Sequence, residues 1–201
     1  MQLIGHDLVC MRGGRQIFAH VSFAVGTGQV LAVTGANGAG KTSLLRMIAG
    51  LLRADAGKLE LREGNPELTI AEQSHFLGHQ DALKPSLTVA ENLQFWDRYL
   101  GDGATKPSPI LEAVGLSALS DFPAGYLSAG QRRRLSVARL IAVKRPIWLL
   151  DEPTAALDQS GQARLAELMQ AHRTGGGMIV AATHGPLGID ASNELTLGIT
   201  S

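Results

Sequence analysis

Apolar residues follow two patterns along this chain. Continuous apolar runs are typical of strands buried on both faces of a parallel sheet, and three occur, at 30–33, 147–150 and 178–182. Helical spacing, with one apolar face, follows the first run from Lys41 to Leu52 and follows the second run around Leu165. Strand, helix and strand in this order predict an α/β fold with a parallel-sheet core.

The chain before residue 63 adds short candidate strands separated by glycine-containing turns. They lie at 7–11, 21–25 and 58–62. Strands this close together, joined by tight turns, are typical of antiparallel pairing. We therefore predict a small antiparallel β layer beside the parallel core.

Between Thr88 and about Val143 the spacing of apolar residues becomes helical. Thr88 and Glu91 match a capping box, in which each side chain bonds the other residue's backbone N–H, so a helix is expected over 89–100. We predict a single domain over residues 1–201 with a helical lobe inserted at about 81–143.

A glycine-rich motif directly follows the first buried run. It has the form G-x-x-x-x-G-K-[ST] and consists of Gly35, Ala36, Asn37, Gly38, Ala39, Gly40, Lys41 and Thr42. In such a loop backbone N–H groups turn toward phosphate oxygens, the lysine reaches the β- and γ-phosphates, and the hydroxyl ligates Mg²⁺. A glycine turn can match this pattern by accident, but here a strand precedes it and a helix follows it, as a nucleotide site requires. We predict binding of ATP with Mg²⁺.

Two adjacent carboxylates, Asp151 and Glu152, end the second buried run. This is the carboxyl edge of a parallel sheet, where α/β proteins bind ligands. Asp151 is suited to hold Mg²⁺, directly or through water, and Glu152 is suited to orient or deprotonate an attacking water. The structural alternative is a solvated acidic turn, and the phosphate loop in the same chain favours the catalytic interpretation.

A further helical segment begins with Ser128, Ala129, Gly130 and Gln131. Ser128 and Gln131 form a capping box, so this segment needs no ligand to explain it. The same helix end also presents N–H groups and a positive dipole end to an anion. From the residues alone, both interpretations stay open.

Taken together, these motifs resemble the ABC transporter ATPase family, and the resemblance covers essentially the whole chain. The matching positions, in order, are 35–42, Gln80, 127–131, 150–154, Asp158 and His184. The resemblance implies a head-to-tail dimer of two copies. Each ATP is then held between the phosphate loop of one copy and Ser128–Gln131 of the other.

The resemblance also implies individual roles. Gln80 contacts Mg²⁺ and the attacking water and responds to a membrane permease, His184 contacts the γ-phosphate, and Asp158 links the two active sites of the dimer. Many relatives stack an aromatic residue on adenine. This chain has Arg12 instead, whose guanidinium plane can stack on the base. Ala129 replaces the first of two signature glycines, a small change that leaves the Ser128 contact intact.

A closer resemblance is to the ATPase subunits of haem exporters in cytochrome c maturation. It rests on four local strings, at 76–81, 87–93, 127–131 and 176–184. It implies an ATPase bound to a membrane permease that powers haem export or the release of a haem-loaded chaperone. Haem is then only an indirect partner, so His79 is interpreted as a packing residue and not as an iron ligand.

Composition narrows the partners and the location. Lys+Arg and Asp+Glu both number 18, so the net charge is zero and no field steers the chain to nucleic acid. No apolar run approaches the roughly 20 residues that cross a bilayer, and the N-terminus lacks the pattern of a signal peptide. We expect a peripheral subunit on the cytoplasmic face of the bacterial inner membrane. The single cysteine, Cys10, is expected in the core.

Three alternatives to the haem role stay open. An ABC ATPase for another cargo, such as a drug, lipid or amino acid, fits the same motifs, because the cargo path belongs to the membrane subunit. A soluble ABC ATPase acting on nucleic acid or ribosomes is disfavoured, since such relatives typically carry added modules. A nucleotide switch with little hydrolysis is disfavoured because Glu152 and His184 are both present.

Overall fold

Residues 1–198, which the computed structural model describes, divide into two units along the chain. The first unit comprises residues 1–78, 145–153 and the segment from 169 onward, and the second comprises 79–144 and 154–168. The expected helical lobe at 81–143 falls inside the span of the second unit. A single domain over the whole chain stays a prediction.

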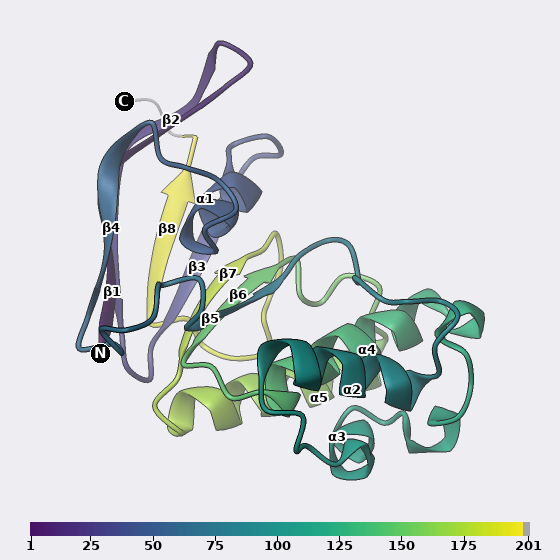
Figure 1. Ribbon diagram of the computed structural model, residues 1–201. Helices are drawn as coiled ribbons and strands as arrows, with labels where there is room; N and C mark the ends of the chain where they lie inside the picture. Colours follow the sequence, from purple (N-terminus) through teal and green to yellow (C-terminus); the bar gives the residue numbers. More distant parts are fainter. Residues whose placement is uncertain (199–201) are drawn as a thin grey trace. The chain divides into compact units, whose positions relative to one another are not determined.

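An antiparallel sheet in the first unit has the strand order β2–β1–β4 (Figure 1). Its strands are β1 (Gln2–Arg12), β2 (Arg15–Gly26) and β4 (Ala56–Arg62). β1 and β2 form a hairpin in which Arg12 lies opposite Arg15 across the Gly13–Gly14 turn. The predicted antiparallel layer is confirmed, and its strands extend beyond the predicted segments.

The second sheet of this unit is parallel, with the strand order β5–β6–β7–β3–β8. Its strands are β3 (Val30–Gly35), β5 (Ser74–Leu77), β6 (Ile147–Asp151), β7 (Met178–Ala182) and β8 (Asn193–Leu197). Every residue of β6 and β7 is buried, as their continuous apolar runs predict. β5 and β8 were not among the predicted strands.

Helix α1 (Lys41–Ile48) follows β3 and ends four residues earlier than predicted. The chain turns at Gly50, which has a φ of +71°. The Gly50 N–H donates to Met47 O at 3.1 Å and the Leu51 N–H donates to Arg46 O at 2.8 Å, the paired bonds of a Schellman motif. The prediction that Leu51 lies on the buried face is therefore wrong, and its side chain is 66% exposed.

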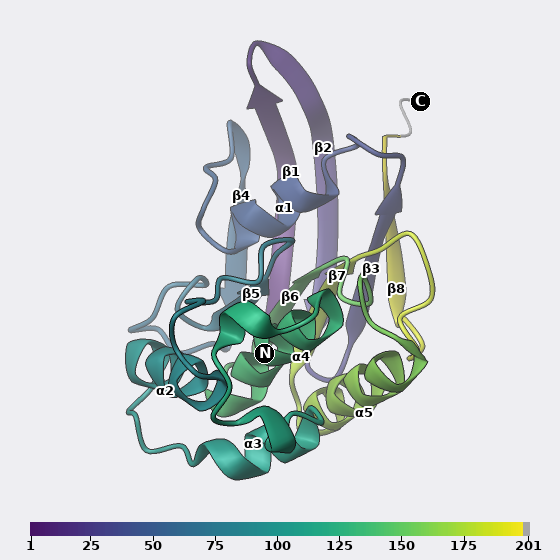
Figure 2. The same ribbon diagram turned by 90° about the vertical axis from the view of Figure 1, so that its right-hand side faces the viewer.

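Both sheets of the first unit and α1, which Figure 2 draws as ribbons, contribute side chains to one hydrophobic core. Leu3 and Leu8 of β1, Leu44 and Leu45 of α1, and Leu149 of β6 are each fully buried in it. Cys10 also lies in this core, as predicted, and burial raises the pKa of its thiol. Because α1 is packed into the core, the loop that precedes it has a fixed end point.

The second unit is helical. Its helices are α2 (Val89–Leu100), α3 (Pro107–Ala113), α4 (Ala129–Ala142) and two 3₁₀ turns, Ser117–Leu119 and Ala124–Tyr126. Helix α5 (Gln159–Thr174) begins in this unit and ends in the first. Both predicted capping boxes are confirmed, at the starts of α2 and α4. None of the helices in residues 1–198 combines the length and apolar character of a membrane span.

The burial of His172, in the last turn of α5, leads us to expect that the stability of the fold depends on pH. Its ring stacks on Trp148 with centroids 4.0 Å apart, and burial lowers the pKa of this imidazole. In the unfolded chain the His172 imidazole has a pKa of about 6.5. As the pH falls through this value, the unfolded chain therefore binds a proton at His172 before the folded chain does. The free energy of unfolding should therefore fall as the pH drops below about 6.5, and it should be constant above about pH 7.

We expect His172→Phe, which keeps a ring on Trp148, to remove this component. Urea unfolding over the range from about pH 8 to pH 5 would measure it as the difference between the two proteins. The exposed His79 offers a matched control, and His79→Phe should leave the slope as in the unchanged chain. Parallel curves for the unchanged chain and His172→Phe would contradict the prediction.

Candidate active site

The phosphate loop joins β3 to α1 in the first unit. Gly40 has a φ of +102°, and a Cβ at this position would lie 2.7 Å from Ile17 Cγ2 and from Phe18 Cδ1. Only glycine allows both this backbone conformation and this close approach of β2. No side chain caps the start of α1, so the N–H groups of its first turn are available to an anion.

Lys41, the first residue of α1, is 8% exposed, and its ammonium is held against the loop. Nζ donates to Gly35 O at 2.9 Å and to Ala36 O at 3.2 Å. Nζ also lies 2.9 Å from His184 Nε2. An ammonium can only donate, so Nε2 accepts in this contact.

Thr42 and Asp151 form a pair of oxygen ligands beside the loop. The Thr42 hydroxyl donates to Asp151 Oδ2 at 2.9 Å and lies 3.1 Å from Oδ1. Within residues 1–198 no three His, Cys, Asp or Glu side chains gather as metal ligands. A hydroxyl and a carboxylate nonetheless fit Mg²⁺, which takes one or two protein ligands and completes its shell with phosphate oxygens and water.

Glu152 follows β6 in a left-handed backbone conformation, with a φ of 46°. Its N–H donates to Ala182 O, the last residue of β7, at 2.9 Å. Glu152 Oε1 lies 3.7 Å from His184 Nε2. The His184 ring thus has the Lys41 ammonium and the Glu152 carboxylate at the same nitrogen, which places a carboxylate beside the phosphate loop.

The first unit therefore brings together the phosphate loop, Asp151, Glu152 and His184. Their meeting follows from the strand order, because β6, β7 and β3 are consecutive in the sheet and end at the same edge. The contact between Lys41 and His184, which are 143 positions apart, was not predicted. Arg12 lies at the exposed end of the β1–β2 hairpin.

Other predicted site residues lie in the second unit. Gln80 is exposed. Ser128 Oγ accepts the Gln131 N–H at 3.2 Å, and the Gln131 side chain accepts the Ser128 N–H at 2.8 Å. Between them, Ala129 is exposed and Gly130 is half-buried. The hydroxyl of Ser128 thus caps α4.

Asp158 caps the start of α5, a role that sequence analysis missed. Its carboxylate accepts the Gly161 N–H at 2.9 Å and the Ser160 hydroxyl at 3.2 Å. The backbone bond from Gly161, followed by the bond from Ser160, lowers the pKa of Asp158. The signal was available in the sequence, since aspartate is a favoured N-cap residue.

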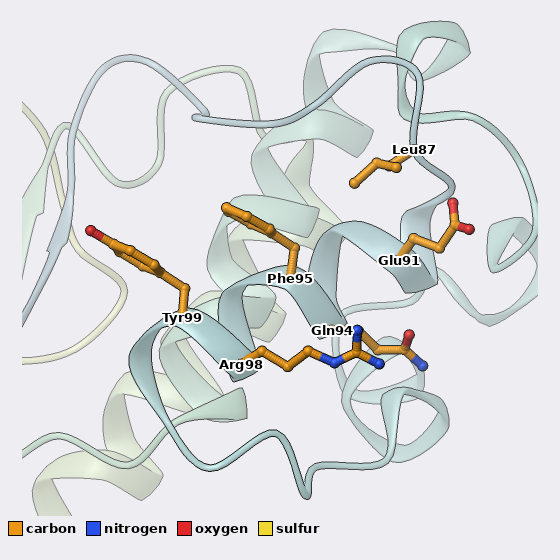
Figure 3. A pocket seen from close by; sticks show the side chains of 6 residues that line it. All are labelled: Leu87, Glu91, Gln94, Phe95, Arg98 and Tyr99. Carbon is orange, nitrogen blue, oxygen red and sulfur yellow. The ribbon is translucent and has the colours of Figure 1, made fainter.

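An open groove of about 600 Å³ on α2 was not predicted (Figure 3). Phe95 and Tyr99 project from the same side of the helix, with their rings stacked at 6.1 Å. Leu87, before α2, opposes the helix, and Glu91 and Arg98 add opposite charges. The spacing of two aromatic residues four apart was the available signal.

Comparison with known proteins gives consistent matches over the chain. The profile of the ABC transporter family matches residues 18–155. The cytochrome c biogenesis ATP-binding export protein CcmA of Nitrobacter winogradskyi is 59% identical over 198 residues, which is 98% of each chain. CcmA of Rhodopseudomonas palustris strain BisB18 is 60% identical over 198 residues, with the same coverage. An ABC transporter ATP-binding protein of Pyrococcus furiosus has the same fold, with a TM-score of 0.82, 20% identity and 98% coverage of both chains.

Proposed function

Because the chain belongs to the ABC transporter family and is the ATP-hydrolysing subunit of such a transporter, we propose that it powers an export step in the biogenesis of c-type cytochromes. The predicted family, fold class and ATPase activity are confirmed by the profile match and by the relatives that match along almost the whole chain. The relatives are named as export proteins of cytochrome c biogenesis, and we propose the same role for this chain.

The observation that carries the catalytic assignment is the cluster of Lys41, His184 and Glu152 beside the phosphate loop. In our proposal Lys41 exchanges the carbonyl oxygens of Gly35 and Ala36 for β- and γ-phosphate oxygens. The N–H groups of the loop, over residues 35–42, and of the uncapped first turn of α1 bind further phosphate oxygens.

Thr42 and Asp151 of the first unit are the residues that we propose hold Mg²⁺. A contact of Gln80 with the cation stays a prediction from the family resemblance. Bound Mg²⁺ neutralises charge that develops on the phosphate oxygens. The Thr42 hydroxyl would then offer its lone pair to the cation and keep its proton on Asp151. Asp151 would also hold waters in the shell of the cation.

Glu152 and His184 act on the attacking water and on the γ-phosphate, respectively. Glu152 orients the attacking water and accepts its proton at a carboxylate oxygen. In the proposal His184 binds the γ-phosphate once the Lys41 ammonium, which now lies at Nε2, shifts onto the phosphate. The ring then carries a proton on Nε2 and donates it to a γ-phosphate oxygen. Arg12 stacks on the adenine base. Ile17 and Phe18 of the same hairpin pack against the phosphate loop at Gly40, so Arg12 sits on an element that contacts the nucleotide loop.

A second copy of the chain would complete each site. The γ-phosphate of ATP bound to one copy meets Ser128–Gln131 of the other, and a single twofold axis creates both sites. The Ser128 hydroxyl, which now accepts the Gln131 N–H, turns toward the phosphate. The phosphate then takes over the N–H groups at the start of α4. In this proposal Asp158, at the start of α5, contacts the other copy and links the two active sites of the dimer.

The proposed partners are a membrane permease and the second copy, with the ATPase held peripherally at the cytoplasmic face of the inner membrane. Haem enters only indirectly, as cargo of the permease or of a haem chaperone that the complex releases. Nucleic acid is not a proposed partner, because formal net charge is zero.

Haem staining of covalent c-type cytochromes tests the proposal in the cell that encodes the chain. With chromosomal Glu152→Gln, we expect staining to be lost while the protein is still present. The companion variant Lys41→Ala should give the same loss by removing a different function. Normal staining with either inactive variant would overturn the role in cytochrome c biogenesis and leave the ATPase assignment in place.

A further inference from the structure

Asp81, the residue directly after Gln80, is bonded to helix α4. The Ser136 hydroxyl donates to Asp81 O at 2.8 Å and lies 3.2 Å from Asp81 Oδ1. Ser136 has no exposed surface. Both partners belong to the second unit, so this contact ties the backbone beside Gln80 to the middle of α4.

Arg132 adds a second connection between the same two segments. Its Nε lies 3.9 Å from Asp81 Oδ2. Its Nη1 donates to Leu127 O at 2.6 Å, and Leu127 immediately precedes Ser128. One guanidinium therefore links the carboxylate of Asp81 to the backbone at the start of the signature segment.

The residue after Asp81 is held from the other side by α2. The Trp96 indole donates to Ala82 O at 3.2 Å, and Ala82 has a φ of 53°. The Arg139 guanidinium lies over the Trp96 ring at 5.0 Å. Burial lowers the pKa of Arg139 to about 10, with Arg133 acting in the same direction and the Asp81 carboxylate opposing both. Asp81 is thus a counter-charge for the buried Arg139 of α4.

We propose that Asp81 is a positioning residue that joins the Gln80 segment to α4, so that Gln80 and the signature segment 127–131 move as one body. The proposal rests on the proposed function, in which Gln80 responds to the permease and Ser128 meets the ATP of the second copy. Through Asp81, a displacement of the Gln80 segment is transmitted to α4 by Ser136 and to Leu127 by Arg132. A pair of rigid segments with shared hydrogen bonds is the kind of contiguous network that carries coupling between sites.

Two variants weaken this link in different ways. Asp81→Ala removes the carboxylate, and Ser136→Ala removes the buried hydroxyl that donates to Asp81. We expect either change to lower kcat for ATP hydrolysis on the order of 10- to 100-fold, the scale of a misplaced catalytic group. KM for ATP should stay within about twofold, because Lys41 and Thr42 in the first unit carry ground-state binding. Asp81→Asn, which retains a side-chain oxygen for Ser136 and Arg132, should restore most of kcat.

The matched control is Thr105→Val in the same unit. The Thr105 hydroxyl donates to a carboxylate, Asp97 Oδ1, at 2.8 Å and to a backbone carbonyl, Ala142 O, at 2.9 Å. It thus makes the same two kinds of bond as Ser136, at a site away from Gln80 in sequence. Thr105→Val should lower the melting temperature and leave kcat unchanged.

Trp96 supplies a spectroscopic readout that does not depend on turnover. The chain has two tryptophans, so in a Trp148→Phe background the emission reports Trp96 and its bond to Ala82. Asp81→Ala should increase quenching of this emission by acrylamide, because the segment before Ala82 loses both carboxylate contacts with α4 and keeps only the bond from Ser136 to the backbone carbonyl of residue 81. Thr105→Val should leave the quenching as it is.

Activity is measured on the full chain in membranes that contain its permease. Unchanged kcat and unchanged Trp96 quenching in folded Asp81→Ala would overturn the inference, as would an equal loss of kcat in Thr105→Val. If Asp81→Ala does not fold, Ser136→Ala and the quenching measurement decide in its place. A lack of ATP turnover in the unchanged chain would instead contradict the proposed function.

Discussion

Glu152→Gln is expected to slow ATP hydrolysis on the order of 10²- to 10⁴-fold, the usual contribution of a general base, while ATP still binds. The amide has nearly the shape of the carboxylate but cannot accept the proton of the attacking water. Its neighbour His184, 3.7 Å away, still reaches the γ-phosphate. Steady-state phosphate release and equilibrium binding of a fluorescent ATP analogue measure the two properties separately.

A second expected effect of Glu152→Gln is accumulation of an ATP-bound dimer, because hydrolysis reopens the proposed dimer. Size-exclusion chromatography with and without ATP and Mg²⁺ would detect it. Glu67→Gln makes the same chemical change at an exposed position of the first unit and should behave like the unchanged chain. Full turnover in Glu152→Gln would show that another group activates the water.

Lys41→Ala is expected to weaken ATP binding itself. A hydrogen bond to a charged group contributes about 1.5–3 kcal/mol, so losing the ammonium should raise the dissociation constant on the order of 10- to 100-fold. The change also leaves the carbonyl groups of Gly35 and Ala36 without their present donor. Titration calorimetry with ATP and Mg²⁺ measures the affinity, and thermal unfolding checks that the chain is folded.

Lys58→Ala is a suitable control for Lys41→Ala. Lys58 lies on β4 of the first unit with 69% of its side chain exposed, and its ion pair with Glu60 is 3.4 Å long. Exposed pairs of this kind contribute little, so ATP affinity should not change. An affinity of Lys41→Ala equal to that of the unchanged chain would contradict the role given to its ammonium.

The strands and helices that sequence analysis predicted are those with strong local signals. Continuous apolar runs marked β6 and β7, and capping boxes marked the starts of α2 and α4. β5 has four residues and begins with Ser74 and His75, while β8 exposes most of its side chains. Neither gives a periodic signal, because both depend on pairing with a neighbouring strand. The end of α1 was wrong because Gly50 stops the helix through its backbone, against an apolar pattern that continues to Leu52.

The candidate site was predictable as a set of motifs but not as a set of contacts. The phosphate loop, Asp151 and Glu152 each carry a local signature. The contact of His184 with Lys41 instead depends on β7 lying between β6 and β3, and strand order is a property of the whole sheet. The two bonds between Ser136 and Asp81 likewise join positions 55 residues apart, and no local pattern announces them.

The left-handed backbone at Glu152 lowers the stability of the fold at a residue whose side chain is needed for hydrolysis. Such a conformation costs a non-glycine residue about 1–3 kcal/mol, and the fully buried β6 together with the bond to Ala182 holds it in place. Glu152→Gly would relieve this strain and is expected to raise the melting temperature while removing the carboxylate. Directed evolution for heat resistance alone would therefore favour an inactive enzyme. A screen for thermostable variants of this chain has to select for ATP turnover at the same time.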